Sequence, residues 1–419
     1  MKRIQIKRLV TAPVTNGLGL SGQNSEFDDP RYIRITDIAE NGSLRTDIFS
    51  SQPRSLIGDA WVSPGDVLIA SVGATVGKTY LHAVKGEYCF AGYLSRVRPN
   101  PDLLSSKFFY YWTHSRDYWT QVRQSVVSST VENLSASRIA AMSIALPSLE
   151  EQRRIAEFLD RETAEIDAFI ADQQRMVELT TEHFRSRADL FIESVDAPYT
   201  KIKYVTDVLS GFPFKSADFE EVPAGGRRLL RGVNIEPSAI RWADSVGIDS
   251  KLADEYPEYL LESGDLVLGL DRPLIRGGLR LARIGEDDAN CLLVQRVARI
   301  RPKDENSVNN SWVEACLLGR RFLQYLEPNF TGVSVPHMSP VQLENFSIPL
   351  PHVDQQKSYV STMSGWSRDH DELVTDLSAS IELSKERRAA LISAAVTGQI
   401  DVSDRYAAEK VYEEVESRQ

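Results

Sequence analysis

The sequence predicts an α+β fold: two globular α/β domains separated by two long antiparallel helices forming a coiled coil, with a pseudo-two-fold internal repeat. Three observations support this. The chain of 419 residues contains one order of motifs twice. Each copy begins with short β-like runs separated by turn signals. Each copy ends in a long segment whose apolar residues recur at helical spacing.

The repeat is visible in matched motifs whose spacing drifts by only a few residues. Met142–Gln152 matches Phe346–Gln356 at an offset of 204 residues. Earlier in each copy, Gly65–Leu68 matches Gly264–Val267 at an offset of 199. Because the order is kept while the spacing drifts, we infer a tandem duplication with loop insertions. Two copies with so long a period exclude a solenoid.

Within each copy, strands should come first and one or two helices should follow before a closing proline. The expected strands are Asp66–Ala70, Tyr93–Arg98, Asp265–Leu270 and Leu292–Ile300, and the expected helical regions are Ser106–Gln124 and Ser311–Leu326. The predicted boundaries are 1–148 for the first domain, 149–196 for the central helix, 197–350 for the second domain, 351–402 for the distal helix and 403–419 for a charged tail.

The two long helices are the clearest structural prediction. The segment Leu149–Ile192 contains no proline or glycine. The segment Val353–Val396 contains no proline and a single glycine, Gly365. A narrow apolar seam on so long a helix needs a partner, so we expect the two helices to pair. The alternative is that each helix packs on its own domain. The candidate helix-pair or subunit interface residues are Ile155, Leu159, Ile166, Phe169, Met176, Val360, Met363, Val374, Leu377 and Ile381.

Charge and composition narrow the class of protein. The net charge is −11, but residues 150–196 carry −7 and residues 351–419 carry −5, which leaves about +1 for the rest. The acidity therefore does not argue against nucleic-acid binding by the domains. With no apolar run of membrane-spanning length and no signal sequence, we expect a cytoplasmic protein without a membrane partner. The three cysteines are far apart, so neither a disulfide framework nor a zinc site is expected.

No catalytic constellation is apparent. Gly73–Thr79 resembles a phosphate-binding loop, but only three residues separate its glycines and a strand-like run, Tyr80–Val84, replaces the required helix. This turn either presents Lys78 to a phosphate backbone or is a plain hairpin. Serine-hydrolase and adenine-methylation motifs are absent, and the histidines lack ligand spacing. We therefore expect a non-enzyme with no catalytic residues and no metal ligands.

Candidate DNA contacts are basic residues clustered in both copies, with hydroxyl residues in equivalent loops. Arginine forks suit guanine edges and phosphates, and hydroxyls donate to phosphates. The candidates are Arg31, Arg34, Lys78, Arg96, Thr130, Arg228, Arg231, Arg272, Arg276 and Ser334.

Together these features resemble the DNA-specificity (S) subunit of a type I restriction–modification system. The resemblance rests on the Gly-Asp strand starts at Gly65 and Gly264, the helix starts Leu146–Gln152 and Leu350–Gln356, and the C-terminal Ala394–Asp401. The turn Gly73–Lys78 is also typical of its target recognition domains, although the second copy has Asp271-Arg272-Pro273 nearby instead.

The resemblance implies that each domain recognises one half of a bipartite double-stranded DNA target. It also implies that the helices set the spacing and dock two modification (adenine methyltransferase) subunits, joined by restriction (translocase/endonuclease) subunits. The chain itself should bind no cofactor, because S-adenosylmethionine, ATP and Mg are expected on the partner subunits. The alternative class is a non-catalytic coiled-coil scaffold or a DNA-mimicking interaction protein.

Overall fold

The structure is a computed structural model that describes residues 2–39, 42–126, 133–222, 225–275, 278–326 and 336–402. The chain divides into two compact units. Unit 1 combines residues 1–174 with the C-terminal part from Leu377, and unit 2 is the continuous segment Arg175–Asp376. The predicted tail 403–419 lies outside the described residues.

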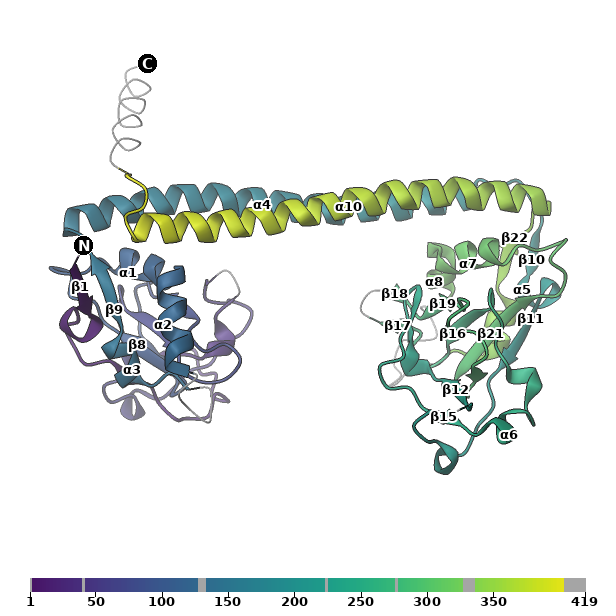
Figure 1. Cartoon of the computed structure of the whole chain (residues 1–419), viewed down its shortest axis with the longest axis horizontal. Helices are drawn as coiled ribbons and strands as arrows, with labels where there is room; N and C mark the ends of the chain where they lie inside the picture. Colours follow the sequence, from purple (N-terminus) through teal and green to yellow (C-terminus); the bar gives the residue numbers. More distant parts are fainter. Residues whose placement is uncertain are drawn as a thin grey trace, which may run out of the picture. The chain divides into compact units, whose positions relative to one another are not determined.

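Unit 1 contains a four-stranded antiparallel sheet in the order β2-β8-β5-β6, a three-stranded sheet β3-β7-β4 and the pair β1-β9 (Figure 1). The strands are β1 Lys2–Gln5, β2 Thr15–Asn16, β3 Arg31–Ile33, β4 Trp61–Val62, β5 Val67–Ala70, β6 Thr79–Leu81, β7 Tyr88–Phe90, β8 Leu94–Val97 and β9 Ser143–Leu146. The short helices are α1 Ser106–Trp112, α2 Arg116–Val126 and α3 Ala136–Ala141.

Unit 2 repeats this plan with the sheet β11-β21-β16-β19, the sheet β15-β12-β20 and the pair β10-β22, and adds the small pairs β13-β14 and β17-β18. The strands are β10 Tyr199–Lys201, β11 Thr206–Ser210, β12 Arg227–Leu230, β13 Ile235–Glu236, β14 Ala239–Ile240, β15 Gly247–Ile248, β16 Leu266–Gly269, β17 Leu274–Ile275, β18 Gly278–Leu279, β19 Leu281–Arg283, β20 Leu292–Leu293, β21 Val297–Pro302 and β22 Ser347–Pro349. The short helices are α5 Ile202–Val205, α6 Ser250–Ala253, α7 Asn310–Leu318, α8 Arg320–Leu326 and α9 Pro340–Asn345.

The repeated motifs of the sequence meet in space in the same way in both units. The carboxylate of Asp66 receives two hydrogen bonds of 2.7 Å from Arg98, and Asp265 receives two of 2.6 Å from Arg301. Both aspartates are almost fully buried. The aspartate of each Gly-Asp motif is therefore held by an arginine at or next to the neighbouring strand, Arg98 beside β8 and Arg301 in β21.

One strand prediction needs correction. The run expected as a single strand over Leu292–Ile300 forms two strands, β20 and β21. Between them Arg296 adopts a left-handed conformation with φ of 68°, which breaks the extended backbone. The first strand joins the three-stranded sheet and the second joins the four-stranded sheet.

The long helices are α4, Leu149–Glu193, and α10, Val353–Val396, and each contributes one part to each unit. In unit 1, Arg388 of α10 pairs with Asp167 of α4 at 2.8 Å. In unit 2, His370 stacks on Phe184, and Tyr359 packs on Phe191 further along α4. Residue numbers rise along one helix as they fall along the other, so the helices run antiparallel.

The helices also complete the hydrophobic cores of the domains. In unit 1, Ile155 and Leu159 of α4 and Ile392 of α10 belong to one buried cluster with Phe108 and Trp112 of α1. In unit 2, Met363 of α10 joins the cluster of Trp312. Both arrangements considered for the long helices are therefore present. The helices pair with each other, and they also pack on the domains. Among the described residues, no helix combines the length and apolarity needed to cross a lipid bilayer.

Candidate nucleic-acid interface

In the first domain, two of the predicted DNA contacts, Arg31 and Arg34, hold loops in place. Arg31, at the start of β3, donates to the carbonyls of Arg45 and Ile48, and its guanidinium lies 5.9 Å from the ring of Phe49. Arg34 forms hydrogen bonds of 2.9 and 3.1 Å to the buried carboxylate of Asp37. Both side chains are half-buried, with donors committed within the fold.

Arg96 lies inside the domain. Its exposed fraction is 6%, and it donates to the carbonyls of Asp59 at 3.0 Å and Trp61 at 2.5 Å. Burial lowers the pKa of this guanidinium from its ordinary value. A side chain enclosed in this way supports the sheet.

The turn Gly73–Lys78 connects β5 and β6, and a strand follows it as expected. Gly73 and Gly77 both have positive φ, 84° and 88°. A Cβ on Gly77 would come within 2.9 Å of the Trp119 ring, so the turn is packed closely on α2. Lys78 is half-buried, with Nζ 3.3 Å from the carbonyl of Ile38.

In the second domain, Arg228 and Arg231 hold positions like those of Arg31 and Arg34, 197 residues later. Arg228 donates to the carbonyl of Asp287 and stacks 4.3 Å from the centre of the Trp242 ring. Arg231 donates to the carbonyl of Asp244. Both guanidinium groups are therefore held by the fold, like their counterparts in the first domain.

Arg272 differs from the other described candidates. It is exposed, and within the described part of the chain no hydrogen bond or ion pair occupies its guanidinium. It lies just after β16, beside Asp271, which binds Arg296 and His337. The predicted contacts Thr130, Arg276 and Ser334 lie outside the described residues.

Sequence reasoning missed Arg296 and His337, which the fold brings to Asp271 from 25 and 66 residues away. It also missed Phe27, which is 85% exposed and stacks on Phe49. The alignment of the two copies could have singled out Arg272, because the offset of 199 places it at the position of Gly73.

The predicted interface residues divide into a buried group and an exposed group. Ile155, Leu159, Ile166, Met363 and Ile381 are buried, whereas Val360, Val374 and Leu377 are half-buried. Phe169 and Met176 are 45% and 50% exposed, so about half of the surface of each residue is open to solvent. Their role in a subunit interface remains a prediction.

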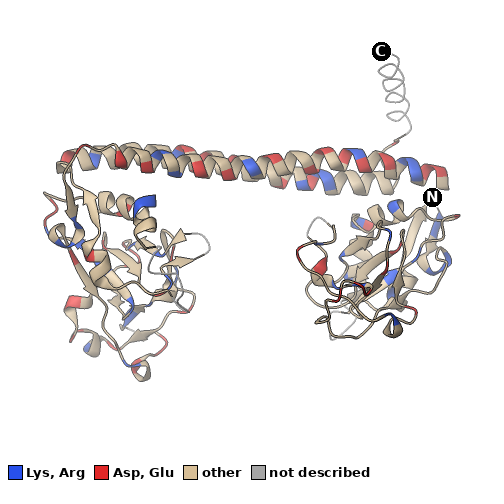
Figure 2. Ribbon diagram, turned by 180° about the vertical axis from the view of Figure 1, so that it is seen from behind, with Lys and Arg blue, Asp and Glu red and all other residues tan. Residues whose placement is uncertain are grey.

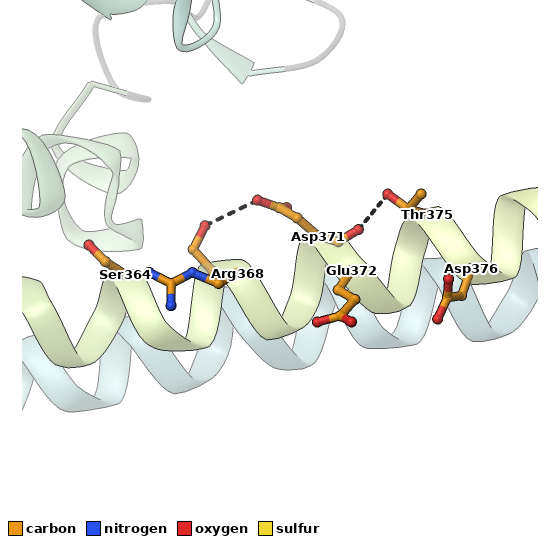
Figure 3. A pocket seen from close by; sticks show the side chains of 7 residues that line it. Ser364, Arg368, Asp371, Glu372, Thr375 and Asp376 are labelled. Carbon is orange, nitrogen blue, oxygen red and sulfur yellow. Dashed lines mark hydrogen bonds between the residues drawn. The ribbon is translucent and has the colours of Figure 1, made fainter.

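Acidic and basic residues are interspersed along both long helices (Figure 2). On α10, Ser367 lies 3.5 Å from the carboxylate of Asp371, and the Thr375 hydroxyl donates to the Asp371 carbonyl at 2.7 Å (Figure 3). A shallow depression here is lined only by polar residues: Ser364, Ser367, Arg368, Asp371, Glu372, Thr375 and Asp376. Its chemistry matches a solvated helix face.

Comparison with known proteins defines the class. Residues 31–178 match the family described as the type I restriction modification DNA specificity domain. The EcoAI specificity subunit of Escherichia coli is 35% identical over 165 residues, which cover 39% of this chain and 27% of that protein. The MjaVIII specificity subunit of Methanocaldococcus jannaschii is 23% identical over 360 residues, which cover 82% of this chain and 81% of that protein.

Solved structures share the fold. A chain from a structural study of complex assembly and conformational transition of the type I R-M system aligns with a TM-score of 0.72 and 16% identity, covering 94% of this chain and 97% of that chain. The HsdS subunit from Thermoanaerobacter tengcongensis aligns with a TM-score of 0.53 and 16% identity, covering 95% and 97%. The class is thus a protein with a type I DNA specificity domain. The chain is similar in sequence to specificity subunits of type I restriction–modification systems and shares the fold of the solved structures.

Proposed function

We propose that this chain is the sequence-specific DNA-binding subunit of a type I restriction–modification complex. The observation that carries the proposal is the duplication of the specificity fold: the same sheets, helices and buried Asp–Arg pair occur in both units of one chain. Two copies of one recognition domain suit a target with two half-sites. Each domain recognises one half of a bipartite sequence in double-stranded DNA.

The long helices set the distance between the half-sites and dock two modification subunits. A helix of the length of α4 extends for roughly 65 Å at 1.5 Å per residue. The polar outward face and the half-exposed Phe169 and Met176 give these helices side chains for partner contacts. The restriction subunits join the complex through the modification subunits.

The chain itself is non-catalytic and acts in the cytoplasm. Adenine methylation with S-adenosylmethionine, and DNA translocation with ATP and Mg, belong to the partner subunits. Among the residues described, no group of three or more His, Cys, Asp or Glu side chains is arranged to hold a metal ion.

The test is to express the chain with and without the modification subunit from the same source and to map adenine methylation across genomic DNA. The proposal expects methylation at a bipartite motif with a fixed gap only when both proteins are present. Methylation by the chain alone would contradict the non-catalytic role. Methylation at a continuous motif without a gap would contradict the recognition of two half-sites.

A further inference from the structure

Arg272 occupies a strained and exposed position at the end of β16. Its φ is 45°, in the left-handed region that side chains other than glycine rarely adopt. The equivalent position of the first domain holds Gly73, with φ of 84°. Both domains therefore have a left-handed residue at this aligned position, but only the second carries a long side chain there. Arginine at this position costs stability that glycine would avoid.

Three chain segments fix the backbone around Arg272. The N–H of Arg272 donates to the carbonyl of Pro336 at 2.8 Å. On the residue before the turn, the N–H of Leu270 donates to the carbonyl of Arg296 at 2.8 Å, and its carbonyl accepts from Met338 at 2.9 Å. The direction in which the Arg272 side chain leaves the surface is therefore set by strand, turn and loop together.

The neighbouring carboxylate holds two further basic side chains at this point. One oxygen of Asp271 lies 2.6 Å from Nδ1 of His337, and the other accepts from Arg296 at 2.6 Å. Arg296 is also left-handed and its side chain is 68% exposed. Partial burial acts to raise the pKa of Asp271, but the hydrogen bonds from His337 and Arg296 outweigh it and hold that pKa below its usual range.

Strained residues that surrounding contacts hold in place are found at binding sites more often than elsewhere. The other described DNA-contact candidates have carbonyl or carboxylate partners, whereas the Arg272 guanidinium keeps all of its donors available within the described residues. An arginine fork on a fixed backbone suits the paired acceptors O6 and N7 of guanine in the major groove. Phosphate oxygens also accept such a fork, but a phosphate contact carries no sequence information, so its loss would not relax a single base pair.

We propose that Arg272 recognises a guanine in the half-site bound by the second domain, with Asp271, Arg296 and His337 as positioning residues. This inference rests on the proposed function and specifies the chemistry of one of its two recognition sites. It assigns base recognition to a side chain whose counterpart in the first domain is a glycine. The two half-sites are therefore read by different chemistry at equivalent turns.

The test uses the full chain assembled with its modification subunit and compares wild type with Arg272→Lys, Arg272→Ala and Arg272→Gly by methylation sequencing. Lysine keeps the charge but loses the bidentate fork. We expect Arg272→Lys to relax one G·C position of one half-site by about tenfold or more, which matches the loss of one good bidentate pair. The other half-site should be unchanged. Arg241→Lys is the matched control, because Arg241 is a 72% exposed arginine of the same domain outside this cluster.

The glycine and alanine variants separate the backbone from the side chain. Both lose the guanidinium, so both should relax the same position. Only glycine removes the left-handed strain, so Arg272→Gly should melt a few degrees higher than Arg272→Ala, roughly 2–4 °C. An unchanged motif in the lysine and alanine variants, or half-sites built only of A·T pairs, would overturn the inference. If the wild-type complex methylates no bipartite motif, the proposed function fails instead.

Discussion

The side-chain oxygen of Gln152 accepts a hydrogen bond from the backbone N–H of Ser105 at 2.8 Å, joining the first turn of α4 to the start of α1. The same amide donates to the carbonyls of Leu103 and Pro147, and its side chain is fully buried. Gln356 repeats this arrangement at the start of α10, with Asn309 as its donor at 2.8 Å. The repeated glutamine thus fixes the angle at which each long helix leaves its domain.

Replacing Gln152 should destabilise unit 1, and replacing Gln356 should destabilise unit 2. Gln152→Leu leaves a buried N–H and two carbonyls without partners, and we expect the free energy of unfolding to fall by about 2–4 kcal/mol. Urea denaturation measures the effect. Gln174→Leu is the control, because Gln174 is an exposed glutamine of the same helix. Equal stability of the two variants would show that the network contributes nothing.

The helix-pair seam and the exposed face of α4 should respond differently to charge. Ile166 is 8% exposed and Phe169 is 45% exposed, three residues apart on one helix. Ile166→Asp buries a carboxylate and should cost about 3 kcal/mol or more of stability. Phe169→Asp should change stability by less than about 1 kcal/mol but weaken retention of the modification subunit. Thermal unfolding and co-purification distinguish the two. If Phe169→Asp lowered the stability more than Ile166→Asp, the helix-pair seam would not lie on the face of α4 that carries Ile166.

Replacing Arg96 should lower the stability of the protein and leave the salt dependence of its DNA binding unchanged. Arg96→Ala removes its hydrogen bonds to Asp59 and Trp61 and should cost about 2–3 kcal/mol. Since the side chain is buried, the salt dependence of DNA binding by the folded protein should stay the same. Titrations at several salt concentrations provide the check. A shallower salt slope would mean that Arg96 contacts a phosphate.

Two histidines, the buried His82 and the half-buried His114, should make unit 1 sensitive to acid. Burial lowers the pKa values of His82 and His114, so the folded state keeps both neutral while the unfolded chain takes up protons below about pH 6.5. Stability is therefore complete above that pH and is lost as the pH falls towards the lower folded values. Each histidine should therefore lower the stability as the pH falls below about 6.5.

Calorimetry at pH 7.5 and 5.5 tests this expectation. The double variant His82→Asn/His114→Asn should lose most of the difference between the two unfolding midpoints. His352→Asn should retain it, because His352 is exposed. A wild-type midpoint that does not change with pH would contradict the role of these histidines.

If the helices set the distance between half-sites, shortening both should shorten the gap. Deleting the seven residues 172–178 from α4 and 374–380 from α10 keeps the seam in phase and removes about 10 Å, equivalent to about three base pairs. Methylation sequencing of the assembled complex should find the same two half-sites with a smaller gap. An unchanged gap would mean that the spacing is set elsewhere.

The repeat and the long helices could be predicted from the sequence because their signals are local. The central helix, expected over 149–196, occupies Leu149–Glu193, and the distal helix, expected over 351–402, occupies Val353–Val396. Periodicity and helix-start motifs depend on neighbours in the chain, and tertiary structure changes them little. The strand run that was wrong contains Arg296, whose left-handed conformation no local pattern indicated.

The candidate site was harder to predict because an arginine has the same sequence signature on the surface and in the interior. Arg96 faces the interior and Arg34 meets a buried aspartate, and only the tertiary fold decides this. His337 reaches Asp271 across 66 residues, beyond any spacing rule. The clustering of basic residues identified candidates in both domains, but which of their side chains are exposed and which are buried or paired could only be seen in the structure.

The division of the chain into units has a consequence for biosynthesis. Unit 2 is one continuous segment, but the core of unit 1 includes Ile392, Ala395 and Val402, which are synthesised after unit 2. At about 5–20 residues per second, more than 200 residues separate the two parts of unit 1 by roughly 10–40 s. The second domain can therefore complete its core while the first still exposes apolar side chains. The first domain is synthesised before the second, but its core is complete only after α10 has been made.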